Sequence, residues 1–259
     1  MSQNYTPIYI ALRYLKGRKS GFLSFISSLA FVSTYLGVAV LIIVSSVMNG
    51  FEKELKERIL NVIPHASIYG LSPIQDWKQV ELNLREDANI EGISPYIETE
   101  ALIKSKSSVV GARINGVDSK KDKSVSVINE FIELGDLSEI EQGDKIILGY
   151  ILARKLNVGL GDKVSLLLPD SNASFAGYFP KSKTFQVGGI FNVGSKELDE
   201  VLAYISLKNA ASLTGLKDKI HGFRIKYENL FDAPYLVWQS LIFAEKDLNN
   251  LLNAEDWSY

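Results

Sequence analysis

A long stretch near the start of the chain carries no charged side chain. Between Lys19 and Glu52 lie 32 residues without Asp, Glu, Lys or Arg. Residues 22–48 within it are mostly apolar and outnumber the ~20 residues that an α-helix needs to cross the hydrocarbon of a bilayer. They also exceed the apolar region of a cleavable signal peptide, which is about 7 to 15 residues long. The pattern therefore predicts a transmembrane helix over 22–48.

Regular apolar spacing continues beyond this stretch. Six residues follow one another at intervals of 4, 3, 4, 4 and 3, which places them on one stripe of a continuous α-helix: Val44, Met48, Phe51, Leu55, Ile59 and Val62. The spacing passes straight through Asn49–Gly50, a pair that often forms a turn. Charged residues beside the stripe form three i,i+4 pairs of opposite sign, and Pro64 marks the end of the helix. We expect an amphipathic stalk over 49–63.

The stripe has two interpretations. Either it packs on the chain's own outer domain, or it faces a partner helix or a lipid substrate. Under the second interpretation the candidate contact residues are Val44, Met48, Phe51 and Leu55.

The charges that precede the apolar stretch predict its direction. Residues 1–51 contain four basic residues, at positions 13, 16, 18 and 19, and no acidic ones. Basic residues beside a membrane span stay on the cytoplasmic side. We therefore expect residues 1–21 to be cytoplasmic and residues 64–259 to form a domain outside the membrane.

Beyond Pro64 the pattern is typical of a mixed α+β domain. Alternating and β-branched runs predict strands at 65–70, 93–103, 109–118, 145–149, 162–169, 184–191, 200–207 and 222–228. "KSKSS" (104–108) is expected to be the turn of a hairpin. Helical patterns predict helices at 76–87, 150–159, 207–215 and 233–252, with Asp76 and Asp232 as candidate N-terminal caps. The predicted fold class is α+β.

Composition excludes some classes of function. The chain has 259 residues, 46% of them hydrophobic, so a substantial core is possible. The absence of cysteine excludes a disulfide framework and a cysteine-bound metal. After residue 51 the chain holds 24 basic and 30 acidic residues, a balance of −6 that argues against nucleic acid as a partner.

Signals for catalysis are weak. "VGLGDKV" (158–164) lacks the spacing of a phosphate-binding loop and predicts a tight turn between a helix and a strand. His65 and His221 lie far apart in the sequence and are expected to be structural rather than metal ligands. The sequence has no G-x-S-x-G serine motif. We expect no cofactor, no metal site and no enzymatic activity in this chain alone.

One long irregular segment interrupts two predicted strands. Residues 169–184 are too many for an ordinary hairpin loop of 2 to 5 residues. Exposed aromatic side chains on such a loop either fold back or meet a partner. If they meet a partner, the candidate docking residues are Pro169, Phe175, Tyr178, Phe179, Pro180, Lys181 and Lys183.

Several blocks resemble a known family. They are "ALRYLKGRKSGFLSFIS", "VSSVMNGFEKELKERILNVIPHASI", "ARINGVD", "IILGYILARKLNVGLGDKVSLLLP" and "TFQVGGIF", which together cover most of the chain. "VMNGFEKEL" and "LGDKVSLLLP" are the most specific. In this order they resemble the permease subunits of lipoprotein-releasing systems (LolC, LolE and LolF), within the wider MacB-like transporter group.

The resemblance implies a fold, a location and partners. It implies one transmembrane helix followed by a MacB-like periplasmic α+β domain, anchored in the inner membrane. Two such subunits join an ATPase pair, take lipoproteins from the bilayer through a cleft lined by the first membrane helices, and pass them to a soluble periplasmic carrier. The carrier docks on a projecting hairpin, whose place residues 169–184 occupy; Lys183 falls where the family tends to have polar or basic residues.

The chain also departs from this family. Family members continue through three more membrane helices, whereas this chain ends at Tyr259, where the outer domain should end. We therefore expect either a fragment or a single-pass protein, and no ATPase contact is assigned to any residue. The alternatives are a single-pass periplasmic scaffold or sensor, or a related MacB- or FtsX-type export or regulatory subunit.

Overall fold

The computed structural model describes residues 9–10, 13, 21–55, 64–168, 181–246 and 252–257, without the side chains of 23, 24 and 52–55. The chain divides into two units, residues 1–55 and 56–259. Each unit is described by itself.

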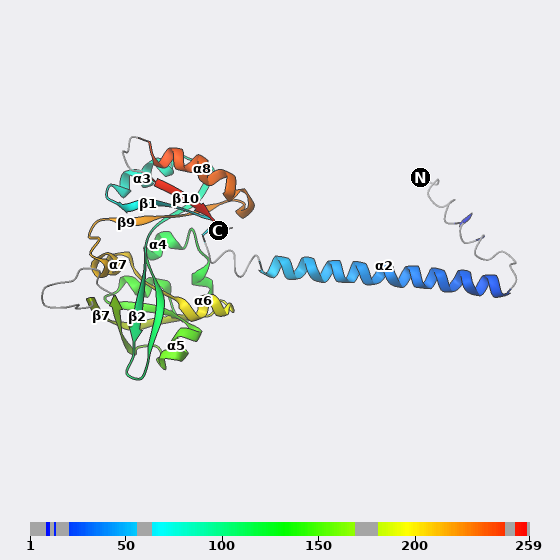
Figure 1. Cartoon of the computed structure of the whole chain (residues 1–259), viewed down its shortest axis with the longest axis horizontal. Helices are drawn as coiled ribbons and strands as arrows, with labels where there is room; N and C mark the ends of the chain where they lie inside the picture. The colour runs from blue at the N-terminus through cyan, green and yellow to red at the C-terminus, as the bar shows by residue number, and fades with distance from the viewer. Residues whose placement is uncertain are drawn as a thin grey trace. The chain divides into compact units, whose positions relative to one another are not determined.

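The first unit is built around the helix α2 (Gly21–Leu55), which continues without a break over 35 residues (Figure 1). Asn49 and Gly50 are helical, so the chain does not turn there, as the apolar spacing predicts. The segment Phe25–Phe51 is long and apolar enough to cross a membrane. Thr34 Oγ1 donates a hydrogen bond to the carbonyl of Ala30 at 2.9 Å, which satisfies a polar group that hydrocarbon would leave unpaired.

The second unit has two lobes. The split lobe takes its name from its two separate chain segments: β1 (Ala66–Ile74), α3 (Trp77–Leu84) and the first half of β2 (Ile90–Lys104), then β9 (Ile220–Tyr227), α8 (Ala233–Ala244) and β10 (Leu252–Asp256). Its strands pair antiparallel in the order β10-β1-β9-β2. This is the ferredoxin-like arrangement of two βαβ units, with α3 and α8 on the same face of the sheet (Figure 1).

The inserted lobe comprises the residues between the two halves of the split lobe. Its elements are β3 (Val109–Val117), α4 (Ser119–Asp122), η2 (Ile128–Phe131), β4 (Ile132–Gly135), η3 (Leu137–Glu141), β5 (Lys145–Gly149), α5 (Tyr150–Leu156), β6 (Lys163–Leu168), β7 (Lys181–Phe191), α6 (Lys196–Val201), β8 (Leu202–Ser206) and α7 (Leu207–Thr214). Strands pair in a closed ring, β2-β3-β8-β5-β7-β6, with β6 returning to β2. Ring closure protects strand edges that would otherwise be left unpaired.

The strand β2 joins the two lobes. Its first half, Ile90–Tyr96, pairs with β9 of the split lobe. Its second half, Tyr96–Lys104, pairs with β3 of the inserted lobe. A single 15-residue strand therefore belongs to both sheets, so the orientation of one lobe is tied to that of the other.

Close packing fixes α7 against the inserted lobe. An added Cβ on Gly116 of β3 would come within 2.1 Å of the Ala210 Cβ on α7, closer than two carbon atoms can approach. Gly111, earlier in the same strand, has no other atom within 4 Å of that position. Glycine at position 116 is thus what lets the helix lie against the strand.

Most predicted elements are present, and the predicted α+β fold class is confirmed. The "KSKSS" turn joins β2 and β3, where Ser105 Oγ accepts hydrogen bonds from the backbone N–H groups of Ser107 and Ser108. "VGLGDKV" is a turn as predicted, with Gly161 at φ 87° and the Asp162 carboxylate accepting from the Gly159 N–H at 2.8 Å.

Asp76 and Asp232 occupy the N-cap positions of α3 and α8, as the sequence predicts, although neither side chain makes a capping hydrogen bond. Two other expectations about element ends are wrong. The last helix ends at Ala244 instead of 252, because Leu252 pairs with Gly70 as part of the edge strand β10. Residues 200 and 201 end α6 rather than begin β8.

Candidate functional site

The predicted contact stripe lies on α2. Val44, Met48 and Phe51 are more than half exposed, whereas the side chain of Leu55 lies outside the described residues. Ile42, on the opposite side of the helix, is as exposed as they are. Exposure therefore does not set the stripe apart from the rest of α2, and its role stays a prediction.

The segment predicted to be a projecting hairpin is flanked by β6 and β7. Leu168 pairs directly with Lys181, and Leu166 with Lys183, so the two ends of the connecting segment are held side by side in an antiparallel ladder. The predicted docking residues Pro169, Phe175, Tyr178, Phe179 and Pro180 lie outside the described residues.

The two lysines at the base of the predicted hairpin differ in their surroundings. Lys183 Nζ lies 2.7 Å from Asp144 Oδ1, donates to Asn209 Oδ1 at 2.8 Å, and sits 5.5 Å from the centre of the Phe185 ring. Lys181 is exposed at the start of β7. Lys183 thus ties the hairpin base to α7, which leaves Lys181 as the lysine better placed to meet an acidic partner.

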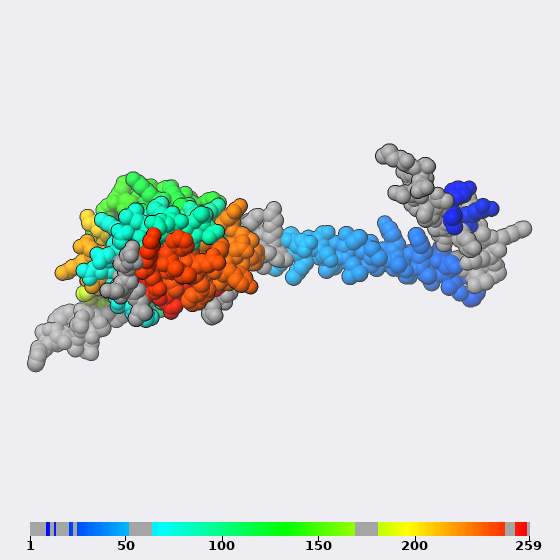
Figure 2. Space-filling model, turned by 90° about the horizontal axis from the view of Figure 1, so that it is seen from above, coloured from blue at the N-terminus to red at the C-terminus, as the bar shows by residue number. Residues whose placement is uncertain are grey.

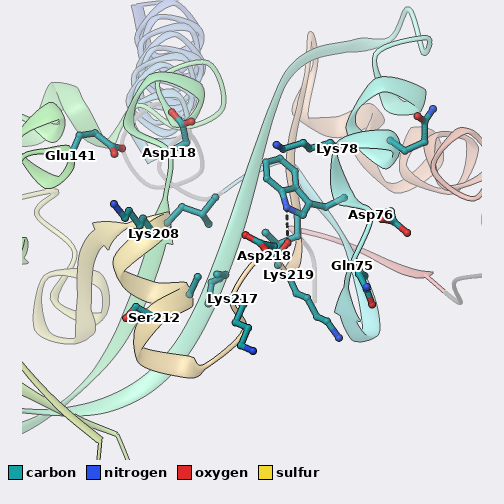
Figure 3. Close-up of a pocket in the computed structure, with 16 residues that line it drawn as sticks. Gln75, Asp76, Lys78, Asp118, Glu141, Lys208, Ser212, Lys217, Asp218 and Lys219 are labelled. Carbon is teal, nitrogen blue, oxygen red and sulfur yellow. Dashed lines mark hydrogen bonds between the residues drawn. The ribbon is translucent and has the colours of Figure 1, made fainter.

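A cleft of about 880 Å³ opens between the two lobes. Glu141, Asp118 and Lys208 lie on one side of it and Gln75 and Asp76 on the other (Figure 3). The indole of Trp77, which also lines the cleft, donates a hydrogen bond from Nε1 to the carbonyl of Asp218 at 3.0 Å.

Two carboxylates at the cleft make hydrogen bonds within the protein. Asp118 caps α4 by accepting hydrogen bonds from the N–H groups of Lys120 and Lys121. Glu141 accepts from the Ser119 N–H at 3.0 Å. Among the described residues no group of three or more His, Cys, Asp or Glu is placed to hold a metal ion.

An ion pair beside the cleft links the two lobes. Lys121 Nζ of the inserted lobe reaches Glu81 Oε2 of α3 at 2.6 Å and lies 5.5 Å from the centre of the Trp77 ring. Burial alone would raise the pKa of Glu81, but hydrogen bonds from Lys121 and Arg85 outweigh it and hold that pKa below its ordinary value.

A second contact between the lobes is buried. Arg224 of β9 donates from Nη2 to Asn115 Oδ1 at 2.6 Å, and its Nη1 lies 3.6 Å from Asp122 Oδ1 of α4. Both Asp122 carboxylate oxygens and the Ser94 hydroxyl lack a hydrogen-bond partner among the described residues. Burial raises the pKa of Asp122, an effect that the charge of Arg224 opposes. No local pattern in the sequence indicates this pair, because its members lie 102 positions apart.

Both histidines are structural, as expected. His65 Nδ1 accepts a hydrogen bond from the Tyr227 N–H, and His221 Nδ1 accepts from the Glu98 N–H, each at 3.2 Å. Burial lowers the pKa of His65, as does the nearby charge of Lys226, and burial also lowers the pKa of His221. Burial therefore favours the neutral form of each imidazole.

Taken together, these features define a class of protein: an α+β domain of two lobes attached to a helix that can cross a membrane. The MacB-like periplasmic core domain family matches residues 27–232, from within α2 to the start of α8. The chain belongs to this family.

Named relatives are similar over nearly the whole chain. The lipoprotein-releasing system transmembrane protein LolC of Neisseria meningitidis serogroup B is 34% identical over 257 residues, 97% of this chain and 60% of its own length. The lipoprotein-releasing system transmembrane protein LolE of Haemophilus influenzae is 32% identical over 259 residues. The alignment covers 97% of this chain and 61% of the length of LolE. The chain thus spans about 60% of the length of these curated relatives.

Among solved structures, the extracellular domain of the noncanonic ABC-type transporter YknZ from Gram-positive bacteria aligns with a TM-score of 0.48 at 8% identity. The alignment covers 73% of this chain and 98% of that one.

Proposed function

We propose that this chain is the membrane-anchored, outward-facing part of a permease subunit in an ATP-driven lipoprotein-releasing transporter. The observation that carries the proposal is the 34% identity, over 97% of the chain, to a protein named as a lipoprotein-releasing system transmembrane protein. ATP hydrolysis takes place in separate ATPase subunits, and this chain supplies no catalytic residue. It acts beside a second permease subunit in the inner membrane, with residues 1–21 in the cytoplasm and residues 64–259 in the periplasm.

In this proposal α2 guides the lipoprotein out of the bilayer. The helix extends past the membrane candidate segment, which ends at Phe51, to Leu55. A lipid anchor that leaves the bilayer must pass this exit. Val44, Met48 and Phe51, on one side of the helix, would contact its acyl chains or the first helix of the partner permease subunit.

The hairpin at 169–184 then docks the soluble carrier that receives the lipoprotein. Direct pairing of Leu168 with Lys181 supports the proposal, because it brings the two ends of the connecting segment side by side, as a docking hairpin requires. Its aromatic side chains offer large apolar area with few rotatable bonds, and its prolines reduce the conformational entropy lost on binding.

Release of lipoproteins from cells depleted of this protein tests the function. Spheroplasts that contain the protein should release newly made outer-membrane lipoproteins to added periplasmic extract, and depleted spheroplasts should retain them. Unchanged release after depletion would contradict the proposal and favour a scaffold or sensor role.

The docking step has its own test. The full protein in detergent should recover the carrier from periplasmic extract, and Phe179→Ala or Pro180→Asp should reduce the recovery. If Phe179 fills a pocket of the carrier, its truncation should weaken binding by at least ~2 kcal/mol, the threshold for a residue that dominates an interface. Full recovery by both variants, with unchanged melting curves, would remove the hairpin from the proposal.

Photocrosslinking tests the α2 contact. A crosslinker at Met48 or Phe51 should capture lipoprotein or the partner permease subunit, whereas one at Lys53 or Lys56, off the stripe, should capture less. Equal capture at all four positions would contradict a one-sided contact.

A further inference from the structure

The outward side of α8 carries an apolar stripe. Tyr235, Trp238 and Ile242 are 78%, 53% and 73% exposed, and Phe231, just before the helix, is 47% exposed. These four residues, here called the α8 stripe, are spaced by 4, 3 and 4 positions and so lie along one side of the helix. Figure 2 shows α8, in orange, at the surface of the domain.

The other side of α8 contributes to the core of the domain. The side of α8 that faces the sheet is formed by other residues, among them the buried Val237, Ser240 and Ala244. Ser240 donates a hydrogen bond to Asp87 and also forms a hydrogen bond with the Tyr227 hydroxyl. The helix is therefore held from one side, and its other side is free to serve a purpose outside the domain.

The neighbouring helix provides an internal comparison. α3 covers the same face of the same sheet, and apart from Leu82 its outward positions are polar, with Lys78 and Gln79 exposed in the helix and Arg85 and Glu86 directly after it. In contrast, α8 holds no charged residue over its whole length, Ala233–Ala244. A helix that is apolar on all sides is normally covered on all sides.

The stripe begins near the first described residues of the domain. The Phe231 ring packs edge-on against Trp257 at 5.9 Å between centroids, and the Trp257 N–H donates to the carbonyl of His65 at 3.3 Å. Pro64, the first described residue of the domain, precedes His65 directly. It follows Leu55 of α2 by nine positions, and a chain of that length reaches at most ~32 Å.

We propose that the α8 stripe rests in the interfacial layer of the bilayer in which α2 is anchored. Tryptophan and tyrosine are enriched in that layer, because their rings prefer an apolar setting while the indole N–H and phenol O–H need polar partners. The anchor also keeps the stripe at high effective concentration near the surface, so a weak interaction is enough to hold it there.

The charge of the domain defines the kind of lipid surface. Residues 64–259 hold 27 acidic and 21 basic residues, a balance of −6. Electrostatic attraction to anionic headgroups therefore does not drive the contact, and burial of apolar side chains does. The stripe should bind a zwitterionic surface at least as well as an anionic one.

Because the chain contains no cysteine, single cysteines can report on the contact in the full protein. An environment-sensitive fluorophore is placed at Ile242→Cys on the stripe and, as the matched control, at Gln79→Cys on α3. Each labelled protein is reconstituted in phosphatidylcholine liposomes, with and without lipids that carry a nitroxide quencher near the headgroup. Position 242 should show blue-shifted emission and strong quenching, and position 79 neither.

Two further measurements test whether the α8 stripe contacts the bilayer or a second copy of the chain. Trp238→Gln combined with Ile242→Gln, both at exposed positions, should abolish quenching of a label at Tyr235→Cys without lowering the melting temperature. In nanodiscs that hold one copy of the chain, quenching at position 242 should persist. Emission typical of water, or shielding that is lost in these nanodiscs, would overturn the proposal, the latter in favour of a second copy.

Addition of 20% anionic lipid should not increase the quenching at position 242; an increase would contradict contact driven by apolar burial. The proposal rests on membrane anchorage through α2 and not on the identity of the substrate, so loss of quenching and loss of lipoprotein release are independent outcomes.

Discussion

Arg224 and Asp122 meet in the interior where the two lobes join, one on β9 and the other on α4. Each is less than a tenth exposed. A buried ion pair of this kind adds little net stability, but removal of one member leaves the other charge without compensation. The two charges are therefore compensated only when the lobes are correctly arranged.

Replacement of Arg224 by leucine should lower the free energy of unfolding by ~3–5 kcal/mol, as expected when a buried charge loses its partner. The loss should be smaller at pH 5 than at pH 8, because Asp122, whose pKa is raised by burial, can become neutral at low pH. The control is Arg113→Leu, which removes an exposed ion pair with Glu98 at 3.6 Å and should cost at most ~1 kcal/mol. Urea unfolding measures both; equal losses would contradict the burial argument.

The two histidines predict a dependence of stability on pH. Their pKa values in the folded protein are lowered, so the stability they contribute is present above ~6.5, the unfolded value, and is lost as the pH falls through the folded values. Asp122, whose pKa is raised, acts in the opposite direction and loses stability as the pH rises. The difference between the wild type and the His65→Gln, His221→Gln double variant isolates the histidines.

Thermal melts of these two proteins between pH 7.5 and pH 5 should show a larger fall in the wild type than in the double variant. Parallel curves would mean that folding does not lower the pKa of either histidine.

At the scale of elements, α7 and β3 are held together by the absence of a side chain. Gly116→Ala should destabilise the domain by ~1–3 kcal/mol, the usual cost of overpacking, because the new methyl would overlap Ala210. Gly111→Ala lies in the same strand with open space around it and should be neutral or slightly stabilising. Chemical denaturation of both variants checks the prediction, and a similar cost at both sites would refute it.

The hairpin base gives a second prediction at this scale. Lys183→Met removes contacts with Asp144 and Asn209 and should lower stability by ~1 kcal/mol, whereas Lys181→Met should leave it unchanged. Position 181, in contrast, should affect association with the proposed carrier: Lys181→Glu should slow association and make its rate less dependent on salt. Stopped-flow association rates, measured beside melting temperatures, separate the two roles.

For the whole molecule, the charge distribution predicts topology. Single cysteines at Ser20 and at Ser107, on the exposed turn between β2 and β3, are to be treated with an impermeant thiol reagent on intact spheroplasts. Ser107→Cys should react at once and Ser20→Cys only after permeabilisation, since basic residues before the helix stay in the cytoplasm. The reverse pattern would invert the orientation and with it the proposed function.

Local patterns in the sequence determined the elements whose stability is itself local. The absence of charge from 20 to 51 predicts the long helix α2, and the spacing of Val44, Met48 and Phe51 predicts its continuity through Asn49–Gly50. Alternation and turn residues predict most of the strands, and Gly215 ends α7 at φ 79° as expected. The wrong predictions concern the ends of elements. Leu252, for example, is apolar and suits either the predicted helix or an edge strand, and it pairs with β1 as part of β10.

Only the tertiary structure decided which residues far apart in the sequence meet. The ring closed by β6 on β2, the shared strand β2 and the Arg224–Asp122 pair all depend on contacts between distant segments, which no periodicity encodes. The same holds for Lys183, whose partners Asp144 and Asn209 come from two other elements. A helix as apolar as α8 is normally buried on all sides, whereas the fold buries only the side that faces the sheet.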